Sequence, residues 1–235
     1  MNDLIIGILG GMGPEATANL YLNLINSTEV TKDQDHFRVI IDSNAKIPDR
    51  TSAILNKGKS PVKELIDTAK NLEKLNVDVG LIPCITAHYY YEDIQKNVDF
   101  KMLNALEELN YYLKEEFENI KKVGVLSTSG TIKTDLFNKY LSDFQMIYPN
   151  EEIQKNYVME AIYGKRGIKK TNDKKYALDL LNKAAKVLLK KDVDIIIAGC
   201  TEIGLVLSKN NLKVNVVDPM DVLIKKVFEL EGKNE

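Results

Sequence analysis

The sequence predicts an α/β protein made of two pseudo-symmetric domains, each a parallel sheet flanked by helices in a duplicated Rossmann-like fold. Two apolar runs, Val77 to Ile82 and Val193 to Ala198, each begin with Val-Asp and lead to a cysteine six positions after that Asp. Such β-branched runs are typical of buried strands. The cysteines, Cys84 and Cys200, are the only two in 235 residues and lie 116 positions apart (200 − 84). We therefore expect a duplication, with the active site in the cleft between its halves.

The first half alternates strand and helix patterns, which parallel β–α–β units with right-handed crossovers require. Leu4 to Leu9 is a short apolar run before a glycine-rich turn, and Pro14 suits the start of the following helix. Val62 to Leu75 carries apolar residues at helical spacing. The expected strands are 4–9, 38–41, 77–82 and 100–103, the expected helices are 16–25, 62–75 and 90–96, and 42–51 is expected to be a polar loop.

The second half repeats this pattern. Val123 to Leu126 resembles Ile6 to Leu9 at a spacing of 117 (123 − 6), and Gly130 follows Gly13 at the same spacing. The expected strands are 123–126, 145–148, the second cysteine run and 214–217; the expected helices are 106–117, 153–163, 176–189, one from about 203, and 220–230. The closing helix could pack on either half. We assign residues 1–104 and 212–235 to an N-terminal domain and 105–211 to a C-terminal domain.

Composition indicates an ordinary globular protein. The hydrophobic fraction is 44%, the charged fraction 28% and the formal net charge −2, which give no reason to expect nucleic acid or an acidic membrane surface as a partner. No apolar run approaches the length of a membrane span, and the N-terminus lacks the pattern of a signal peptide. We therefore expect a cytoplasmic protein without a membrane partner.

The two cysteines are the first candidates for chemistry. Each follows the carboxyl end of an expected strand, where open α/β sheets bind ligands, and a thiol at a helix N-terminus is favoured as thiolate. A lone buried cysteine is usually a small core residue. Two at matched positions could instead serve as two bases on opposite faces of one carbon, as inversion of a carbon acid requires. The absence of a C-x-x-C spacing argues against a zinc site, and His88 is expected to make a helix hydrogen bond.

Three further stretches could bind a ligand. The turn Gly10 to Gly13 matches neither the dinucleotide fingerprint nor the P-loop, but its amide groups could hold a carboxylate. Arg50 and Lys165 lie 115 positions apart (165 − 50), close to the repeat period, so each half could offer one cation to a carboxylate. The run Lys169 to Lys175 is expected to be a solvated loop.

Together these motifs resemble the aspartate/glutamate racemase family, most closely its aspartate racemase branch. The resemblance is carried by Ile6 to Thr17, Asp49-Arg50-Thr51, Pro83 to His88 and Gly199 to Ile203. It implies a racemase independent of pyridoxal phosphate, with no cofactor or metal, an amino acid as small-molecule substrate, and usually a homodimer. In this resemblance Cys84 and Cys200 match the catalytic thiol pair. The substrate-binding positions are Met12, Arg50 with its neighbour Thr51, Thr86, Lys165 and Thr201.

One position departs from the family pattern. The first cysteine motif usually reads Pro-Cys-Asn-Thr, and here Ile85 replaces the Asn. An aspartate racemase with two thiols is the first hypothesis, and a related isomerase acting on glutamate or another amino or dicarboxylic acid is the second. A non-catalytic anion-binding protein and a redox role are the alternatives from other classes. The preferred amino acid, the enantiomer served by each thiol, and the roles of His88 and Glu202 stay open.

Overall fold

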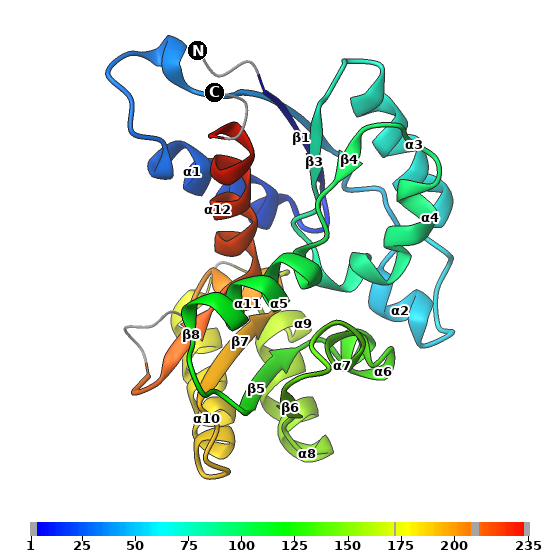
Figure 1. The fold of residues 1–235 in the computed structure, drawn as a ribbon. Coiled ribbons are helices and arrows are strands. Elements are labelled where there is room, and N and C mark those ends of the chain that lie inside the picture. The colour runs from blue at the N-terminus through cyan, green and yellow to red at the C-terminus, as the bar shows by residue number, and fades with distance from the viewer. Residues whose placement is uncertain (1–3, 172, 208–211, 233–235) are drawn as a thin grey trace. The chain divides into compact units, whose positions relative to one another are not determined.

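The computed structural model describes residues 4–171, 173–207 and 212–232 (Figure 1). The chain divides into two compact units, Met1–Glu108 with Met220–Glu235 as unit 1 and Leu109–Pro219 as unit 2. Each unit is built on one four-stranded parallel sheet with helices against it. The prediction of two α/β halves with parallel sheets is confirmed.

The sheet of unit 1 has the strand order β2-β1-β3-β4, with every neighbouring pair parallel. The run around Ile6 and Ile8 is fully buried at the centre of this sheet, as a near-continuous apolar sequence requires. The strands are β1 (Ile5–Gly10), β2 (Arg38–Ser43), β3 (Val79–Leu81) and β4 (Lys101–Met102).

Helices cover both faces of this sheet. Figure 1 shows α1 and α12 on one side of the strands and α3 and α4 on the other. The α-helices are α1 (Pro14–Ser27), α2 (Arg50–Ile54), α3 (Val62–Glu73), α4 (Tyr91–Gln95) and α12 (Pro219–Glu231), and short 3₁₀ helices are η1 (Asp33–Asp35) and η2 (Ile85–Tyr90). Helix α5 (Ala105–Glu116) begins in unit 1 and continues into unit 2.

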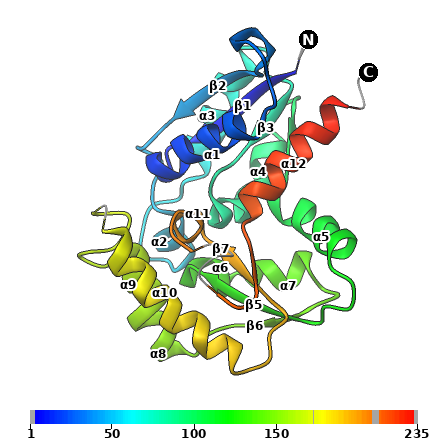
Figure 2. The same ribbon diagram turned by 90° about the vertical axis from the view of Figure 1, so that its left-hand side faces the viewer.

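The sheet of unit 2 has the same order, β6-β5-β7-β8, and is also parallel throughout. Figure 2 shows α9 and α10 on one side of its strands and α7 on the other. The strands are β5 (Lys122–Ser127), β6 (Gln145–Ile147), β7 (Ile195–Gly199) and β8 (Asn215–Val217). The helices are α6 (Ser129–Lys133), α7 (Leu136–Tyr140), α8 (Glu151–Ile153), the π-helical turn η3 (Gln154–Met159), α9 (Glu160–Tyr163), α10 (Lys174–Leu189) and α11 (Thr201–Gly204).

The Asp of each Val-Asp pair makes the same hydrogen bonds in both units. The Asp78 carboxylate accepts a hydrogen bond from the Ile5 N–H at 2.7 Å, and the Asp78 N–H donates to the Ile5 carbonyl at 2.9 Å. The Asp194 carboxylate and N–H make the same pair of bonds with Lys122, both at 2.8 Å. Each Asp therefore fixes the start of the first strand of its sheet.

The valine of each pair explains why the first strand contains a glycine. A Cβ on Gly7 would lie 2.7 Å from a methyl of Val77, and one on Gly124 would lie 3.3 Å from a methyl of Val193. The first approach would force a shift of Val77, and the second is tighter than ordinary van der Waals contact, so a residue without a side chain relieves crowding at both positions. The repeat in the sequence thus corresponds to a repeat in packing.

Three expectations about elements need correction. Residues 50–51 were placed in a loop, but Arg50 begins α2 because the Asp49 side chain caps it through the Ser52 N–H at 2.7 Å. Helices α6 and α7 were not expected, and the helix expected from residue 203 is the single turn α11, which starts at 201. The predicted boundary at 211 stays a prediction; the compact unit 2 extends to Pro219, and β8 pairs with β7 in its sheet.

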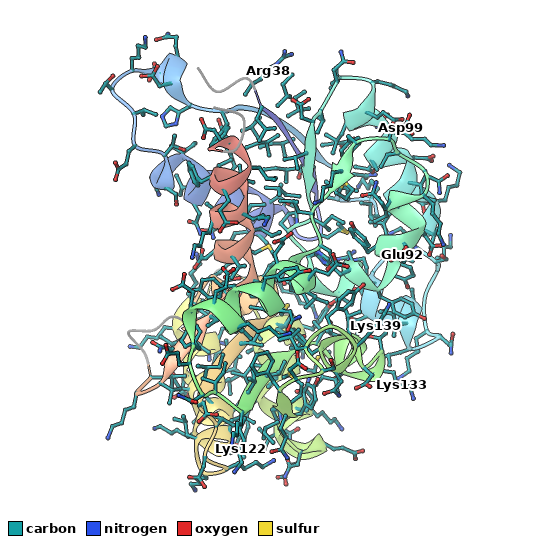
Figure 3. The ribbon with its side chains drawn as sticks, in the orientation of Figure 1. Arg38, Glu92, Asp99, Lys122, Lys133 and Lys139 are labelled. Atoms are coloured by element: carbon teal, nitrogen blue, oxygen red, sulfur yellow. The ribbon has the colours of Figure 1, made fainter. Side chains whose placement is uncertain are left out.

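Charged side chains lie on the outside of the units, among them Arg38, Asp99 and Lys133 (Figure 3). No helix in the described ranges has both the length and the apolar character that crossing a membrane requires.

Candidate active site

The two cysteines occupy equivalent positions, one in each unit. Cys84 follows β3 and is the residue before η2, and Cys200 follows β7 and is the residue before α11. Both have an extended backbone, with φ −161° and ψ 102° for Cys84 and φ −146° and ψ 134° for Cys200. Both are free thiols, 6% and 5% exposed. Each sulfur therefore lies where a central strand turns into a helical segment.

His88 holds the backbone of Cys84 in place. Its Nε2 accepts a hydrogen bond from the Ala105 N–H at 3.1 Å, and its Nδ1 lies 3.0 Å from the Cys84 carbonyl oxygen. Because Nε2 must be an unprotonated acceptor, the proton is on Nδ1 and donates to Cys84. The neutral ring therefore links the cysteine turn to the start of α5. Its bond to the Cys84 carbonyl, four residues earlier, is of the kind predicted for His88 from the sequence.

The environment of His88 keeps it neutral. Its side chain is 1% exposed. Burial lowers the pKa of His88 to about 4, although the hydrogen bonds to Cys84 and Ile85 act in the opposite direction. At neutral pH this histidine is therefore a structural link.

The glycine-rich turn after β1 depends on a left-handed residue and a threonine. Gly11 has φ +91°, and a Cβ there would lie 2.3 Å from the Asn44 carbonyl carbon, so only glycine fits. The Thr17 hydroxyl accepts from the Gly11 N–H at 2.9 Å and donates to the Gly13 carbonyl at 3.0 Å. The turn is therefore rigidly shaped before any ligand binds.

Arg50 joins this turn to the loop after β2. Arg50 is 7% exposed, and its guanidinium donates to the Met12 carbonyl at 3.1 Å and the Pro48 carbonyl at 2.9 Å, with a longer bond of 3.3 Å to the Ile47 carbonyl. Met12, Ile47 and Cys84 belong to one hydrophobic cluster, and α2 packs against η2. Unit 1 therefore brings together the expected Met12, Arg50 and Cys84.

The other candidates of unit 1 are also buried. Thr51, the second residue of α2, and Thr86, in η2, are each 5% exposed. Ile85, which replaces the family's Asn, is 1% exposed. An isoleucine directly after the cysteine therefore offers an apolar surface where an amide could have donated hydrogen bonds.

Cys200 begins a chain of three interacting side chains in unit 2. Its thiol donates to Glu202 Oε2 at 3.0 Å, and the other oxygen, Oε1, forms an ion pair with the Lys169 ammonium. The Thr201 hydroxyl also donates to Oε2, at 3.3 Å. Glu202 is 4% exposed, so this is a buried carboxylate fully engaged by donors.

This environment acts on the ionisation of both acids. Burial raises the pKa of the Cys200 thiol well above its ordinary value, and the nearby Glu202 carboxylate adds to the effect against the pull of Lys169. Burial alone would raise the pKa of Glu202, but Lys169 and the hydrogen bond from Cys200 outweigh it and hold that pKa below its ordinary value. The carboxylate is therefore charged and the thiol protonated at neutral pH.

Lys169 and Glu202 lie beside Cys200, although the sequence pattern did not predict a role for either. The run beginning at Lys169 was expected to be a solvated loop; this is wrong for Lys169 itself, whose side chain is only 19% exposed. Lys165, the expected cation, is exposed, and within the described residues it forms no ion pair. The motif Cys-Thr-Glu was a signal for Glu202, but no local pattern pointed to a lysine 33 positions away.

Within residues 4–171, 173–207 and 212–232, no three side chains of His, Cys, Asp or Glu form a group able to hold a metal ion.

The family model for Asp/Glu/hydantoin racemases matches residues 9–227, nearly the whole chain. The chain belongs to the Asp/Glu/hydantoin racemase family. A broad specificity amino-acid racemase from Bacillus subtilis, RacX, is 30% identical over 226 residues, which are 94% of this chain and 95% of that protein.

Solved structures of the family show the same fold. The aspartate racemase of Picrophilus torridus superposes with a TM-score of 0.85 at 26% identity, covering 97% of this chain and 94% of its own. A glutamate racemase of Francisella tularensis, solved with D-glutamate, gives a TM-score of 0.64 at 17% identity and covers 100% of this chain and 83% of its own. At that identity the likeness shows the fold alone.

Proposed function

We propose that this family member is an amino acid racemase that works without a cofactor, with aspartate as its preferred substrate. One observation carries the proposal: Cys84 and Cys200 occupy the same position in two sheets of the same strand order. Racemisation needs one group to remove the α-proton from one face of the carbon and another to return a proton to the opposite face. Two equivalent thiols meet that need.

The proposed reaction moves two protons and leaves the total charge unchanged. One cysteine, as thiolate, takes the α-proton; the C–H electron pair stays on the α-carbon, and the other cysteine, as thiol, donates its proton to the opposite face. At the end of the turnover the thiolate and the thiol have exchanged places, and the enantiomer of the substrate has formed. The mechanism requires both sulfurs to approach the same α-carbon.

Cations would stabilise the carbanion in this reaction. In the proposal Arg50 and Lys165 neutralise the carboxylates of the substrate, so that charge developing on the α-carbon is offset electrostatically. The Arg50 guanidinium is already oriented by the carbonyls of Met12 and Pro48, which reduces the entropy lost when a carboxylate binds. The threonines Thr51, Thr86 and Thr201 stay proposed contacts with the substrate, as does Met12.

Ile85 favours a second candidate, a racemase of broad specificity. The buried isoleucine beside Cys84 suits an apolar side chain better than a polar one. RacX, the Bacillus relative, is named for broad specificity, whereas the Picrophilus relative is named an aspartate racemase. The two candidates share the same two-thiol reaction and differ only in the substrate.

Incubation with a panel of L-amino acids in D₂O tests the proposal. Proton NMR would follow loss of the α-proton signal, and chiral chromatography would follow formation of the D-enantiomer. We expect aspartate to exchange fastest, without added pyridoxal phosphate. Faster exchange of amino acids with apolar side chains would support the broad-specificity candidate, and no exchange with any amino acid would contradict a racemase. The homodimer implied by the family resemblance stays a prediction, which light scattering in solution can test.

A further inference from the structure

The buried ion pair next to Cys200 is built into unit 2. Hydrogen bonds from the Ile168 N–H to the Ala161 carbonyl at 2.9 Å and from the Lys169 N–H to the Ile162 carbonyl at 3.1 Å lead the loop after α9 back onto that helix. The Lys169 ammonium there lies 5.6 Å from the centre of the Tyr163 ring. The backbone of the loop thus determines where the lysine can reach.

The charge state of this pair decides where the thiol proton resides. Burial disfavours the charged form of a carboxylate, and Glu202 is only 4% exposed. The ion pair with Lys169 keeps it charged, and a charged carboxylate can only accept hydrogen bonds. The short contact between Cys200 Sγ and Glu202 Oε2, 3.0 Å, must therefore contain the proton of the thiol.

We propose that Glu202 is a positioning residue that keeps the proton on the Cys200 sulfur in the free protein, and that Lys169 orients the Glu202 carboxylate and partly offsets its charge. The equivalent position two residues after Cys84 is Thr86, a hydroxyl in place of the carboxylate. The two halves therefore differ in charge beside the thiol although their folds match. This difference makes the two cysteines unequal before substrate binds.

Two other charged residues of unit 2 make contacts of their own. Asp218 lies beside the end of α11, where its carboxylate fills the space that a Cβ on Gly204 would need. Arg166 is occupied by the Asp173 carboxylate, at 2.6 Å, on the exposed side of the loop. The charges that act on the Cys200 thiol are those of Glu202 and Lys169.

The consequence for catalysis rests on the two-thiol reaction proposed above. If Cys200 holds the proton in the free enzyme, Cys84 must be the thiolate that accepts the α-proton of the first substrate. The proton on Cys200 then passes to the other face of the carbon, and Cys200 becomes the thiolate. The free protein is therefore ready for the enantiomer whose α-proton points toward Cys84.

A titration of Cys200 alone tests the inference without relying on activity. In a Cys84→Ser background Cys200 is the single thiol, and its ultraviolet thiolate absorbance can be followed from about pH 6 to about pH 11 after subtraction of the Cys84→Ser/Cys200→Ser protein. Glu202→Gln keeps the size and an acceptor oxygen but removes the charge, so the midpoint should fall by about one pH unit or more. Lys169→Met should raise the midpoint, because it removes the cation that favours the thiolate while the Glu202 carboxylate is still ionised in the alkaline range of the titration.

The opposite directions of the two shifts separate the proposal from a purely structural role. Loosened packing would expose the thiol in both variants and lower both midpoints, and that result would overturn the inference. Lys170→Met, which changes the exposed neighbour of Lys169, is the matched control and should leave the midpoint unchanged. An unchanged midpoint in Glu202→Gln would also overturn the inference.

The same variants give a second readout in the presence of Cys84. The inference predicts that the pH profile of kcat/KM for one enantiomer shifts to lower pH in Glu202→Gln and to higher pH in Lys169→Met, with partial rescue by Lys169→Arg. If Glu202→Gln does not fold, Lys169→Met and Lys169→Arg still test the direction. Opposite shifts of the Cys200 midpoint without any α-proton exchange would support the inference and contradict the proposed function.

Discussion

Replacing His88 by Gln should remove a defined part of the acid sensitivity of the fold. The imidazole is fully enclosed between the Cys84 carbonyl and the Ala105 N–H, with a pKa of about 4 against an ordinary 6.5. Unfolding exposes the ring, so between these two pH values the unfolded chain binds a proton that the folded chain does not. Stability is therefore fully present above about pH 6.5 and is lost as the pH falls toward about 4.

The magnitude follows from the size of that difference. A separation of about 2.5 pH units corresponds to about 3 kcal/mol at 1.36 kcal/mol for each unit, a large part of the stability of an ordinary domain. Urea unfolding followed by circular dichroism, at pH values from about 7 to about 4, should show this loss in the wild type on top of the losses due to carboxylates. His88→Gln should lose about 3 kcal/mol less over the same range.

The other histidine of the chain provides the control. His36, half-buried in the 3₁₀ region after α1, can be changed to Gln without touching the cysteine turn. His36→Gln also simplifies the NMR spectrum to the single imidazole of His88, so its titration can be followed directly. A His88 signal that titrates near 6.5, or equal acid sensitivity of wild type and His88→Gln, would refute the reasoning.

Three further substitutions test the site. Gly11→Ala should cost more than about 2 kcal/mol of unfolding free energy in urea, because φ is +91° and the new Cβ would meet the Asn44 backbone; a cost below about 0.5 kcal/mol would contradict the strain argument. Arg50→Lys should reduce kcat/KM nearly as much as Arg50→Ala, because an ammonium cannot reproduce the planar fork that donates to the Met12 carbonyl; near-normal kcat/KM in the lysine variant would refute this. Ile85→Asn should raise kcat/KM for aspartate with little gain on apolar amino acids. A lower kcat/KM for aspartate in a folded Ile85→Asn variant would show that aspartate is not the preferred substrate.

The duplicated fold could be predicted because one short sequence pattern occurs once in each half of the chain. Each Val-Asp pair, followed by an apolar run and a cysteine, contains both the residue that fixes the first strand and the strand itself. The hydrogen bonds between Ile5 and Asp78 and between Lys122 and Asp194 join residues that are distant in the sequence. Both pairs belong to a pattern that recurs at a nearly constant spacing, and this recurrence indicates the duplication.

The short helices were harder to predict because they depend on single caps rather than on periodic apolar residues. Asp49 starts α2 and Thr128 starts α6, where its side chain accepts from the Thr131 N–H. Each of these helices has five residues, too few to show an amphipathic pattern. The periodicity of apolar residues therefore predicted the long helices. It did not predict α2, which begins at Arg50, or α6, which follows β5.

The charge beside Cys200 could not be predicted for a different reason. A lysine in a run of charged residues is most often solvated, and Lys169 differs from Lys170 only in the direction that the loop gives its side chain. That direction follows from backbone hydrogen bonds to Ala161 and Ile162. The ion pair between Lys169 and Glu202 joins residues 33 positions apart, so it can be identified only in the folded structure.

The central claim, that Cys84 and Cys200 act as two bases on one carbon, is tested most directly by α-proton exchange and racemisation in the single serine variants. L- and D-aspartate would each be incubated in D₂O with the wild type, Cys84→Ser and Cys200→Ser, following deuterium incorporation and the opposite enantiomer together. We predict that each variant loses racemisation in both directions by orders of magnitude, while a variant can retain exchange of the one enantiomer whose α-proton faces its remaining thiol. Racemisation near the wild-type rate in either variant would contradict the two-thiol account.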